Sequence, residues 1–360
     1  MFDTARTILT YAFVLGVLVF FHELGHYLAA RARGVTVEVF SIGFGPALVS
    51  WRARSGTVWK VSALPLGGYV KMQGWGEPND PAPPLPGSFA GTSLGSKAFI
   101  VAAGPLANLL LAFVLFSGLF MTVGRVVVQP VFSTVEPASP AAAAGFRAGD
   151  RVLAVNGEQI KNFSQLQEVV SRHPDEAVDF TLLRQGKVLQ QRVSLNDVMV
   201  DGAKIGHLGV AGSVSSIQHF SPPGAVVAGA LETWNDSKGM LSGLYNLVVH
   251  RQGLGQLAGP LGIAEVTGQV AALGIISVIS FIAFLSINLG LINLVPIPIL
   301  DGGHLLFYLA EAIYGRPLPA RAMDIGLRFG AALIISLFFL TTFNDLSRMG
   351  AVSWVVHLFG

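Results

Sequence analysis

LTYAFVLGVLVFFHELGHYLAA occupies residues Leu9–Ala30 and is the most informative stretch of this chain. It is long enough to cross the hydrocarbon core of a bilayer as an α-helix, which takes about 20 apolar residues. It contains HELGH, which matches the metal-site pattern H-E-x-x-H. On a helix, His22 and His26 project from one face and can share a metal ion, and Glu23 can reach a water molecule bound to it. Because ionisable side chains in a membrane span cost roughly 3 kcal/mol each, these residues are functional candidates.

The composition is that of a membrane protein with a soluble part. Of the 360 residues, 52% are hydrophobic and 12% are charged, whereas about 25% of residues are charged in soluble domains. The net charge of +2 gives no reason to expect nucleic-acid binding. The chain has no cysteine, which excludes disulfides, cysteine-ligated zinc and a thiol nucleophile. A metal ion would therefore be bound by histidine and carboxylate ligands.

Four stretches are predicted to span the membrane as helices. They are Leu9–Ala30, Ala98–Val123, Leu273–Leu294 and Ile325–Phe343. The first has no clear cleavage site and is interpreted as a retained helix, not a signal peptide. Basic residues gather between the first two spans and again between or beside the last two. By the positive-inside rule both of these loops are cytoplasmic, which leaves both termini and the large central segment on the extracytoplasmic side.

The segments that flank the spans have other patterns. Val35–Met72 alternates polar and apolar residues with many β-branched and aromatic ones, which predicts a membrane-associated β-region with turns at Gly43–Pro46 and Pro65–Gly68. Gly74–Gly87 is a proline-rich loop. Pro222–Gln269 has apolar residues at helical spacing, which favours a helix lying at the membrane surface.

The central segment Val126–Gly212 is rich in charged residues and has the pattern of a small soluble domain, with a hairpin that turns at Gln185-Gly186. Its motifs Ala144-Gly145-Phe146, Gly149-Asp150-Arg151-Val152 and Val155-Asn156-Gly157 resemble a bacterial PDZ domain. The resemblance implies that this domain binds extended peptide by adding a strand to a sheet edge.

A catalytic zinc ion normally takes three protein ligands and keeps a fourth position for water. The third ligand must therefore come from outside HELGH. Asp301 directly follows the third span, in the segment NLVPIPILDGGH, Asn293–His304. The two prolines of this segment break helical hydrogen bonding and its glycines free the backbone to turn, so that a carboxylate can be presented at membrane depth. His304 is an alternative third ligand.

HELGH, the pattern Asn293…Pro296-x-Pro298-x-x-Asp301-Gly302 and the intervening PDZ-like segment together resemble the site-2 protease family, and more closely its bacterial RseP-like members. The resemblance covers essentially the full length, including Gly104–Asn108 and Pro65–Met72. It implies that Zn²⁺ is bound by His22, His26 and Asp301, with Glu23 as general base. One departure is that the best-known members carry two tandem PDZ domains, and this chain has room for one.

The resemblance also implies a substrate and a place for it. The substrates would be single-span membrane proteins, such as anti-sigma factors already trimmed outside the membrane, or remnant signal peptides, cut in regulated intramembrane proteolysis. In the β-region around Pro65–Met72, Gly67, Gly68 and Tyr69 would hold the unwound substrate as an added strand, with a plain amphipathic hairpin as the alternative. Asn293 would bond the substrate backbone, with helix packing as the alternative. Asn108 has the same two interpretations, and helix packing is favoured for it.

The sequence thus predicts a multi-span α-helical membrane protein with four transmembrane helices, a β-region and one inserted α+β PDZ domain. The predicted domains are residues 1–124, 125–212 (PDZ), 213–269 (surface helix and linker) and 270–360. The expected location is the bacterial cytoplasmic (inner) membrane, in contact with lipid. Two other functions are a non-catalytic PDZ membrane adaptor with a vestigial metal site and a metal transporter. The presence of Glu23 speaks against the adaptor, which needs no base beside the ligands.

Overall fold

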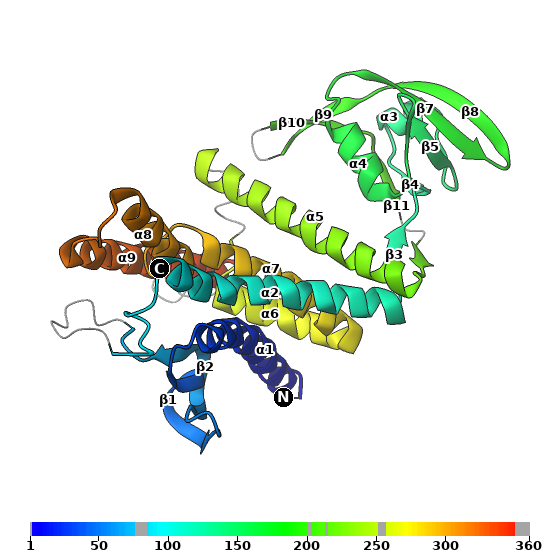
Figure 1. Ribbon diagram of the computed structural model, residues 1–360. Helices are drawn as coiled ribbons and strands as arrows, with labels where there is room; N and C mark the ends of the chain where they lie inside the picture. Colours follow the sequence, from blue (N-terminus) through cyan, green and yellow to red (C-terminus); the bar gives the residue numbers. More distant parts are fainter. Residues whose placement is uncertain (1, 76–84, 201–202, 213–214, 251–256, 350–360) are drawn as a thin grey trace, which may run out of the picture. The chain divides into compact units, whose positions relative to one another are not determined.

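The computed structural model describes residues 2–75, 85–200, 203–212, 215–250 and 257–349, which form two compact units (Figure 1). Unit 1 comprises Met1–Leu119, Val226–Val249 and Leu254–Gly360, and unit 2 comprises Phe120–Ala225 and His250–Gly253. Most of the predicted proline-rich loop, Gly74–Gly87, lies outside the described residues.

Among the described residues, four helices are long and apolar enough to cross a membrane. They are α1 (Phe2–Ala32), α2 (Leu94–Thr122), α7 (Ile275–Leu294) and α9 (Ala320–Arg348). This confirms the four apolar helices that the sequence predicts, although most of their ends extend beyond the predicted limits. The region expected to form one surface helix contains two, α5 (Pro222–Val249) and α6 (Pro260–Ala272). A further helix, α8 (Asp301–Tyr314), was not predicted.

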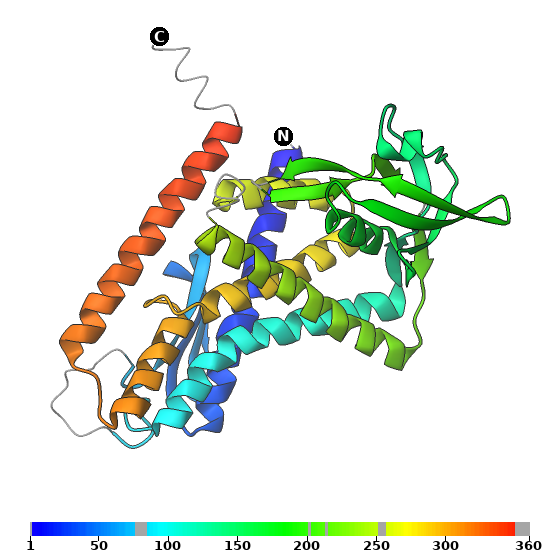
Figure 2. The same ribbon diagram turned by 90° about the horizontal axis from the view of Figure 1, so that it is seen from above.

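Helices α2, α6 and α7 pack against α1 (Figures 1 and 2). Val14 and Leu18 of α1, Leu111 of α2, and Val278 and Ile282 of α7 form one buried apolar cluster. Helix α1 also packs against α6. The segment that carries HELGH is therefore held by helices from both ends of the chain.

Strands β1 (Val37–Arg52) and β2 (Val58–Met72) form a sheet that packs against α1. The β-structure was predicted, but the turns expected at Gly43–Pro46 and Pro65–Gly68 are wrong. The chain reverses between the two strands, at residues 53–57, and both expected turns lie inside strands. The glycines there bend the strands without ending them.

These bends let the two strands pair twice. Gly43 and Gly67 have φ angles of 88° and 131°, and the ladder changes register near them, as it does at β-bulges. Residues 39–42 consequently pair with 58–61 on one side and with 68–71 on the other. Among the described residues, the segment 68–71 has a ladder partner on one side only. It is therefore an edge segment of this sheet.

Unit 2 is a small α+β unit. Its elements are β3 (Arg125–Val128), β4 (Phe132–Val135), α3 (Pro140–Ala143), β5 (Arg151–Val155), β6 (Glu158–Gln159), α4 (Phe163–Ser171), β7 (Ala177–Arg184), β8 (Lys187–Ser194), β9 (Asn196–Val200), β10 (Ala203–His207), β11 (Val210–Gly212) and β12 (Ser215–Gln218). Four strands form a sheet in the order β6-β5-β7-β8, and β4 pairs with β11, β3 with β12 and β9 with β10.

The core of unit 2 is apolar and its main hairpin is the predicted one. Phe146 packs against both Phe132 and Phe180, and α4 adds Leu166 to the same cluster. Strands β7 and β8 are joined by Gln185-Gly186, whose φ angles are 47° and 79°. Positive φ at both residues is the geometry of a tight hairpin turn. The α+β pattern and this turn are confirmed, and the assignment as a PDZ domain stays a prediction.

Candidate metal centre

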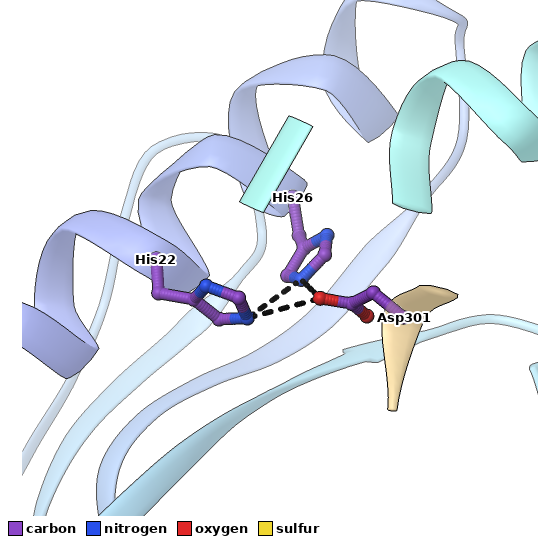
Figure 3. A group of neighbouring side chains, drawn as sticks. All are labelled: His22, His26 and Asp301. Atoms are coloured by element: carbon purple, nitrogen blue, oxygen red, sulfur yellow. Dashed lines mark hydrogen bonds and ion pairs between the residues drawn. The ribbon is translucent and has the colours of Figure 1, made fainter. Parts of the chain in front are cut away.

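Three predicted ligands come together within unit 1 (Figure 3). Nε2 of His22 lies 3.2 Å from Oδ2 of Asp301, and Nε2 of His26 lies 3.4 Å from it. The two Nε2 atoms are 3.3 Å apart. His22 and His26 share one face of α1, and Asp301 is the first residue of α8. Residues nearly 280 positions apart in the chain thus meet at one point.

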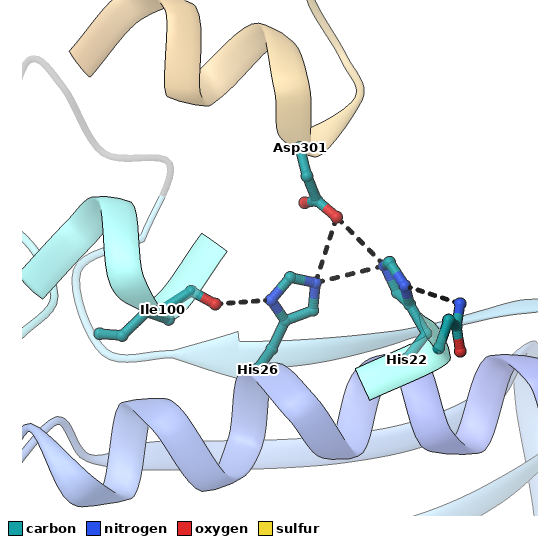
Figure 4. Close-up of polar contacts among 5 residues, drawn as sticks. His22, His26, Ile100 and Asp301 are labelled. Atoms are coloured by element: carbon teal, nitrogen blue, oxygen red, sulfur yellow. Dashed lines mark hydrogen bonds and ion pairs between the residues drawn. The ribbon is translucent and has the colours of Figure 1, made fainter. Parts of the chain in front are cut away.

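The other nitrogen of His26 has a fixed partner. Nδ1 lies 2.9 Å from the carbonyl oxygen of Ile100 in α2. A carbonyl oxygen only accepts hydrogen bonds, so Nδ1 carries the hydrogen and donates it. In a neutral ring, Nε2 is then unprotonated and its lone pair is directed towards the centre of the cluster. Figure 4 shows Ile100 and Asp301 approaching the two different nitrogens of this ring.

This arrangement fits a bound cation. Oδ2 of Asp301 is buried and makes no hydrogen bond to another described residue, although two ring nitrogens lie at ion-pair distance from it. A carboxylate oxygen and an imidazole lone pair facing one another are unfavourable unless a proton or a cation lies between them. Two imidazole nitrogens and one carboxylate oxygen, with a further position for water, are a donor set of catalytic zinc sites. The residues present therefore fit a zinc ion.

The segment before Asp301 is irregular, as predicted, but Asp301 itself starts a helix. Helix α7 ends at Leu294, and residues 295–300 form tight turns before α8 begins. Ile299 has a φ of 103°, which is rare for a β-branched residue and marks strain. A Cβ on Gly302 would overlap the carbonyl of Leu294. Only glycine at 302 lets the chain fold back closely enough to present this carboxylate.

His304, the alternative third ligand, is not part of the cluster found among the described residues. Its ring lies 5.7 Å from the ring of Trp75, centroid to centroid. Asn293 lies in the last turn of α7 and is half-buried. Its part in binding substrate stays a prediction.

The predicted substrate segment Gly67–Tyr69 lies beside HELGH. A Cβ on Gly68 would be 3.1 Å from Cγ of Glu23 and would also crowd the backbone oxygen of Ser41. Glycine at 68 therefore lets β2 approach the residue expected to act as base. Next to it, the ring of Tyr69 stacks on Phe44 with 6.0 Å between centroids.

Sequence reasoning missed how closely α2 holds the two histidines. A Cβ on Gly104 would overlap the ring of His26, and Asn108 lies with Nδ2 3.3 Å from Nδ1 of His22. Asn108 was expected to be a packing residue, yet it is fully buried against a predicted ligand. The signal that could have found it is an amide in an apolar span, four residues from a glycine on the same helix face.

Comparisons with known proteins agree with this chemistry. Residues 10–337 match the model of a family described as peptidase family M50. A Rhizobium meliloti relative is 40% identical over 95% of this chain and 96% of its own length. Metalloprotease MmpA of Caulobacter vibrioides is 33% identical over 96% and 97% of the two chains. Zinc metalloprotease RasP of Geobacillus kaustophilus is 31% identical over 97% and 99%.

Among solved structures, the PDZ domain of an SdrC-like protein from Listeria monocytogenes matches 24% of this chain and 87% of its own. The sequence identity is 17% and the TM-score is 0.21.

Proposed function

The chain belongs to peptidase family M50, and from that premise we propose that this zinc metalloprotease is an intramembrane endopeptidase. Its substrates are single-span membrane proteins, which it cuts within their transmembrane segments. The observation that carries the proposal is that two residues of the cluster, His22 and His26, lie on α1, a helix apolar enough to cross a membrane. A hydrolytic centre on such a helix suits a peptide bond that is itself within the membrane.

His22, His26 and Asp301 would hold the zinc ion. When bound, zinc supplies a Lewis acid that activates water near neutral pH. Glu23 takes the proton from the attacking water and delivers it to the leaving amine. Burial of His26 and the limited exposure of Asp301 restrict the access of bulk water to the cluster.

The edge segment 68–71 is the proposed docking site for substrate. A peptide bond in a helix is shielded, because its carbonyl is engaged in the helical hydrogen bonds. Pairing with a sheet edge would hold the unwound peptide extended by backbone hydrogen bonds. Gly68 lies against Glu23, so a strand added here would pass close to the base. Gly67, Tyr69 and Asn293 complete the proposed substrate contacts.

The finer assignments follow from the resemblance to the RseP-like proteases. The substrates are anti-sigma-factor-like proteins, and remnant signal peptides are a further group. The enzyme lies in the bacterial cytoplasmic membrane, with the central domain on the extracytoplasmic side, where it binds peptide. The basic residues between the first two spans support this orientation.

The test is cleavage of a model single-span substrate by the full chain in liposomes, with the products identified by mass spectrometry. Wild type is expected to cut within the span. Glu23→Gln is expected to keep its zinc and to lose at least about 100-fold in rate. Glu265→Gln, an exposed carboxylate of α6, is the matched control and should cleave normally. Cleavage by Glu23→Gln at the wild-type rate, or cuts only outside the span, would contradict the proposal.

A further inference from the structure

Asn108 is a buried residue whose side-chain amide contacts His22 at Nδ1, the ring nitrogen that does not face Asp301. It lies in α2, is 0% exposed, and its Nδ2 is 3.3 Å from Nδ1 of His22. Its Oδ1 is also buried and has no hydrogen-bond partner among the described residues. Buried polar atoms in proteins are nearly always paired, so an unpaired amide oxygen next to a predicted ligand needs an explanation.

The Asn108 amide, which contacts His22, and the Ile100 carbonyl, which contacts His26, differ in the hydrogen bonds that they can make. The Ile100 carbonyl can only accept, and so it fixes the hydrogen of His26 on Nδ1. An asparagine amide can either donate through Nδ2 or accept through Oδ1. With Nδ2 facing His22, Nδ1 accepts and the hydrogen of a neutral ring resides on Nε2. A protonated Nε2 cannot bind a metal ion.

A half-turn of the amide exchanges its two polar atoms and leaves its shape almost unchanged. Oδ1 then accepts a hydrogen bond from Nδ1–H of His22, and Nε2 becomes the unprotonated nitrogen. That nitrogen is the one that lies 3.3 Å from Nε2 of His26 and 3.2 Å from Oδ2 of Asp301. The same rotation pairs Oδ1 with His22 and places Nδ2 where Oδ1 was, a position with no hydrogen-bond partner among the described residues.

We propose that Asn108 is a positioning residue for zinc: its Oδ1 holds His22 in the Nδ1–H tautomer and so presents Nε2 to the metal ion. This inference rests on the proposed assignment of His22 as a zinc ligand. Partners of this kind orient metal-binding histidines in many proteins.

The backbone around Asn108 is held in place, so the amide is the part that can adjust. Oγ of Ser286 in α7 donates a hydrogen bond to the Asn108 carbonyl at 2.8 Å, and both residues are fully buried. A Cβ on Gly290 would lie 2.9 Å from the carbonyl oxygen of Pro105, so α7 and α2 are in close contact here. Helix α7 leads to Asp301. Asn108 therefore lies where the two parts of the metal site are joined.

Three substitutions separate this role from simple packing. Asn108→Leu keeps a side chain of similar size but cannot accept a hydrogen bond. Asn108→Asp keeps an acceptor and loses the donor. Asn288→Leu is the matched control, because Asn288 also lies in an apolar helix, α7, and its side chain donates to the carbonyl of Phe284 one turn earlier in that helix. Zinc affinity is measured by competition with a chromophoric chelator, and ligand geometry by the visible absorption of the cobalt-loaded protein.

Asn108→Leu is expected to bind zinc about 10- to 100-fold more weakly and to change the cobalt spectrum. Asn108→Asp and Asn288→Leu should both keep the wild-type spectrum, and their affinities should change by less than about tenfold. If leucine prevents folding, as judged by gel filtration of the metal-free protein, Asn108→Ala replaces it. This variant also lacks an acceptor, so the same loss of zinc affinity and the same change in the cobalt spectrum are expected.

Wild-type affinity and spectrum in Asn108→Leu would overturn the positioning role. A loss in Asn108→Asp as large as that in Asn108→Leu would also overturn it, because donation through Nδ2 would then be what matters. His22→Ala separates this inference from the proposed function. If His22→Ala retains zinc, the ligand assignment itself fails; if it loses zinc while Asn108→Leu does not, only the role of Asn108 fails.

Discussion

His26 uses its two ring nitrogens for different tasks. Nδ1 donates to Ile100, and Nε2 faces His22 and Asp301. The first contact fixes the hydrogen on one nitrogen, and this frees the lone pair of the other for a metal ion. The proposed zinc site thus also depends on residues that are not among its proposed ligands.

A second buried charge, in unit 2, has a purely structural setting. The Asp150 side chain is 1% exposed, and Arg184 donates to both of its oxygens at 2.6 Å. The backbone N–H of Arg147 also donates to it. Burial by itself would raise the pKa of Asp150, but the hydrogen bonds from Arg184 and the backbone lower it below its ordinary value. A carboxylate with a lowered pKa in the folded state stabilises the fold above its unfolded pKa of about 3.9.

We therefore expect Asn at position 150 to weaken unit 2. The Asp150→Asn variant should reduce the opening free energy by about 2–3 kcal/mol at neutral pH, because it removes a charged hydrogen-bond acceptor from Arg184. In wild type this stabilisation should be lost as the pH falls below about 4 and through the lowered folded-state pKa. Hydrogen exchange of peptides from β5 and β7 measures both effects. Asp179→Asn, which changes an exposed carboxylate of β7 that pairs with the exposed Arg192, is the control; equal effects of the two variants would refute the prediction.

At the residue scale, the sequence was enough to predict the three proposed metal ligands, because local geometry points to each of them. The spacing of His22 and His26 requires only a helix, and Asp301 stood out because prolines and glycines surround it. Ile100 and Asn108 could not be assigned in the same way, because their contacts with the histidines depend on how α2 packs against α1. That packing brings together residues 74 and 86 positions apart.

Between elements, the close contact of α1 and α2 depends on glycine. A Cβ on Gly25 would overlap the carbonyl of Ala103, and a Cβ on Gly104 would overlap the ring of His26. Small residues at such positions let apolar helices approach closely. The approach brings the α2 carbonyl of Ile100 within hydrogen-bond distance of His26.

A methyl group at position 104 should therefore disturb the metal site without unfolding the protein. In Gly104→Ala the His26 ring must move or α2 must retreat, and zinc affinity should fall by at least about tenfold. Gly118→Ala in the same helix is the control, since a Cβ there meets no described atom within 4 Å. Chelator competition gives both affinities. An unchanged affinity in Gly104→Ala would show that this contact does not position His26.

At the scale of elements, length and hydropathy were enough to predict the four apolar helices. The residues of the turn were enough to predict the hairpin at Gln185-Gly186. Glycine was misread where it bends a strand, because Gly43 and Gly67 have the same signature inside a bulge as in a turn. Helix α8 was missed because the Pro-rich segment before it and the Gly302-Gly303 pair within it read as a loop. Whether such a glycine lies in a turn, a bulge or a helix depends on its tertiary contacts, which involve residues distant in the sequence.

For the whole molecule, the distribution of apolar surface is consistent with a membrane. Residues 44–52 of β1 are exposed, and among them Leu48 is 68% and Trp51 is 50% exposed. Helix α9 likewise exposes many large apolar side chains. Apolar surface of this extent is typical of contact with lipid or with another protein. The basic residues near β1 and β2 place this region on the cytoplasmic side in the proposed orientation.

The absence of cysteine makes that orientation easy to test. Single cysteines at Ser55, between β1 and β2, and at Gln190, on β8, are both at exposed positions. In intact cells whose outer layers are permeable to the reagent, a membrane-impermeant maleimide should label Gln190→Cys and should leave Ser55→Cys unlabelled until the membrane is opened. The reverse pattern would place the central domain in the cytoplasm and overturn the proposed orientation.

The central claim is that His22 and His26 share one zinc ion with Asp301, a residue from the far end of the chain. Metal content of the purified full chain tests it most directly. Wild type and His304→Ala are expected to carry about one zinc ion per chain, and Asp301→Ala is expected to carry almost none, because it loses one of the three ligands that a catalytic zinc site requires. Full zinc content in Asp301→Ala, or its loss in His304→Ala, would contradict the claim.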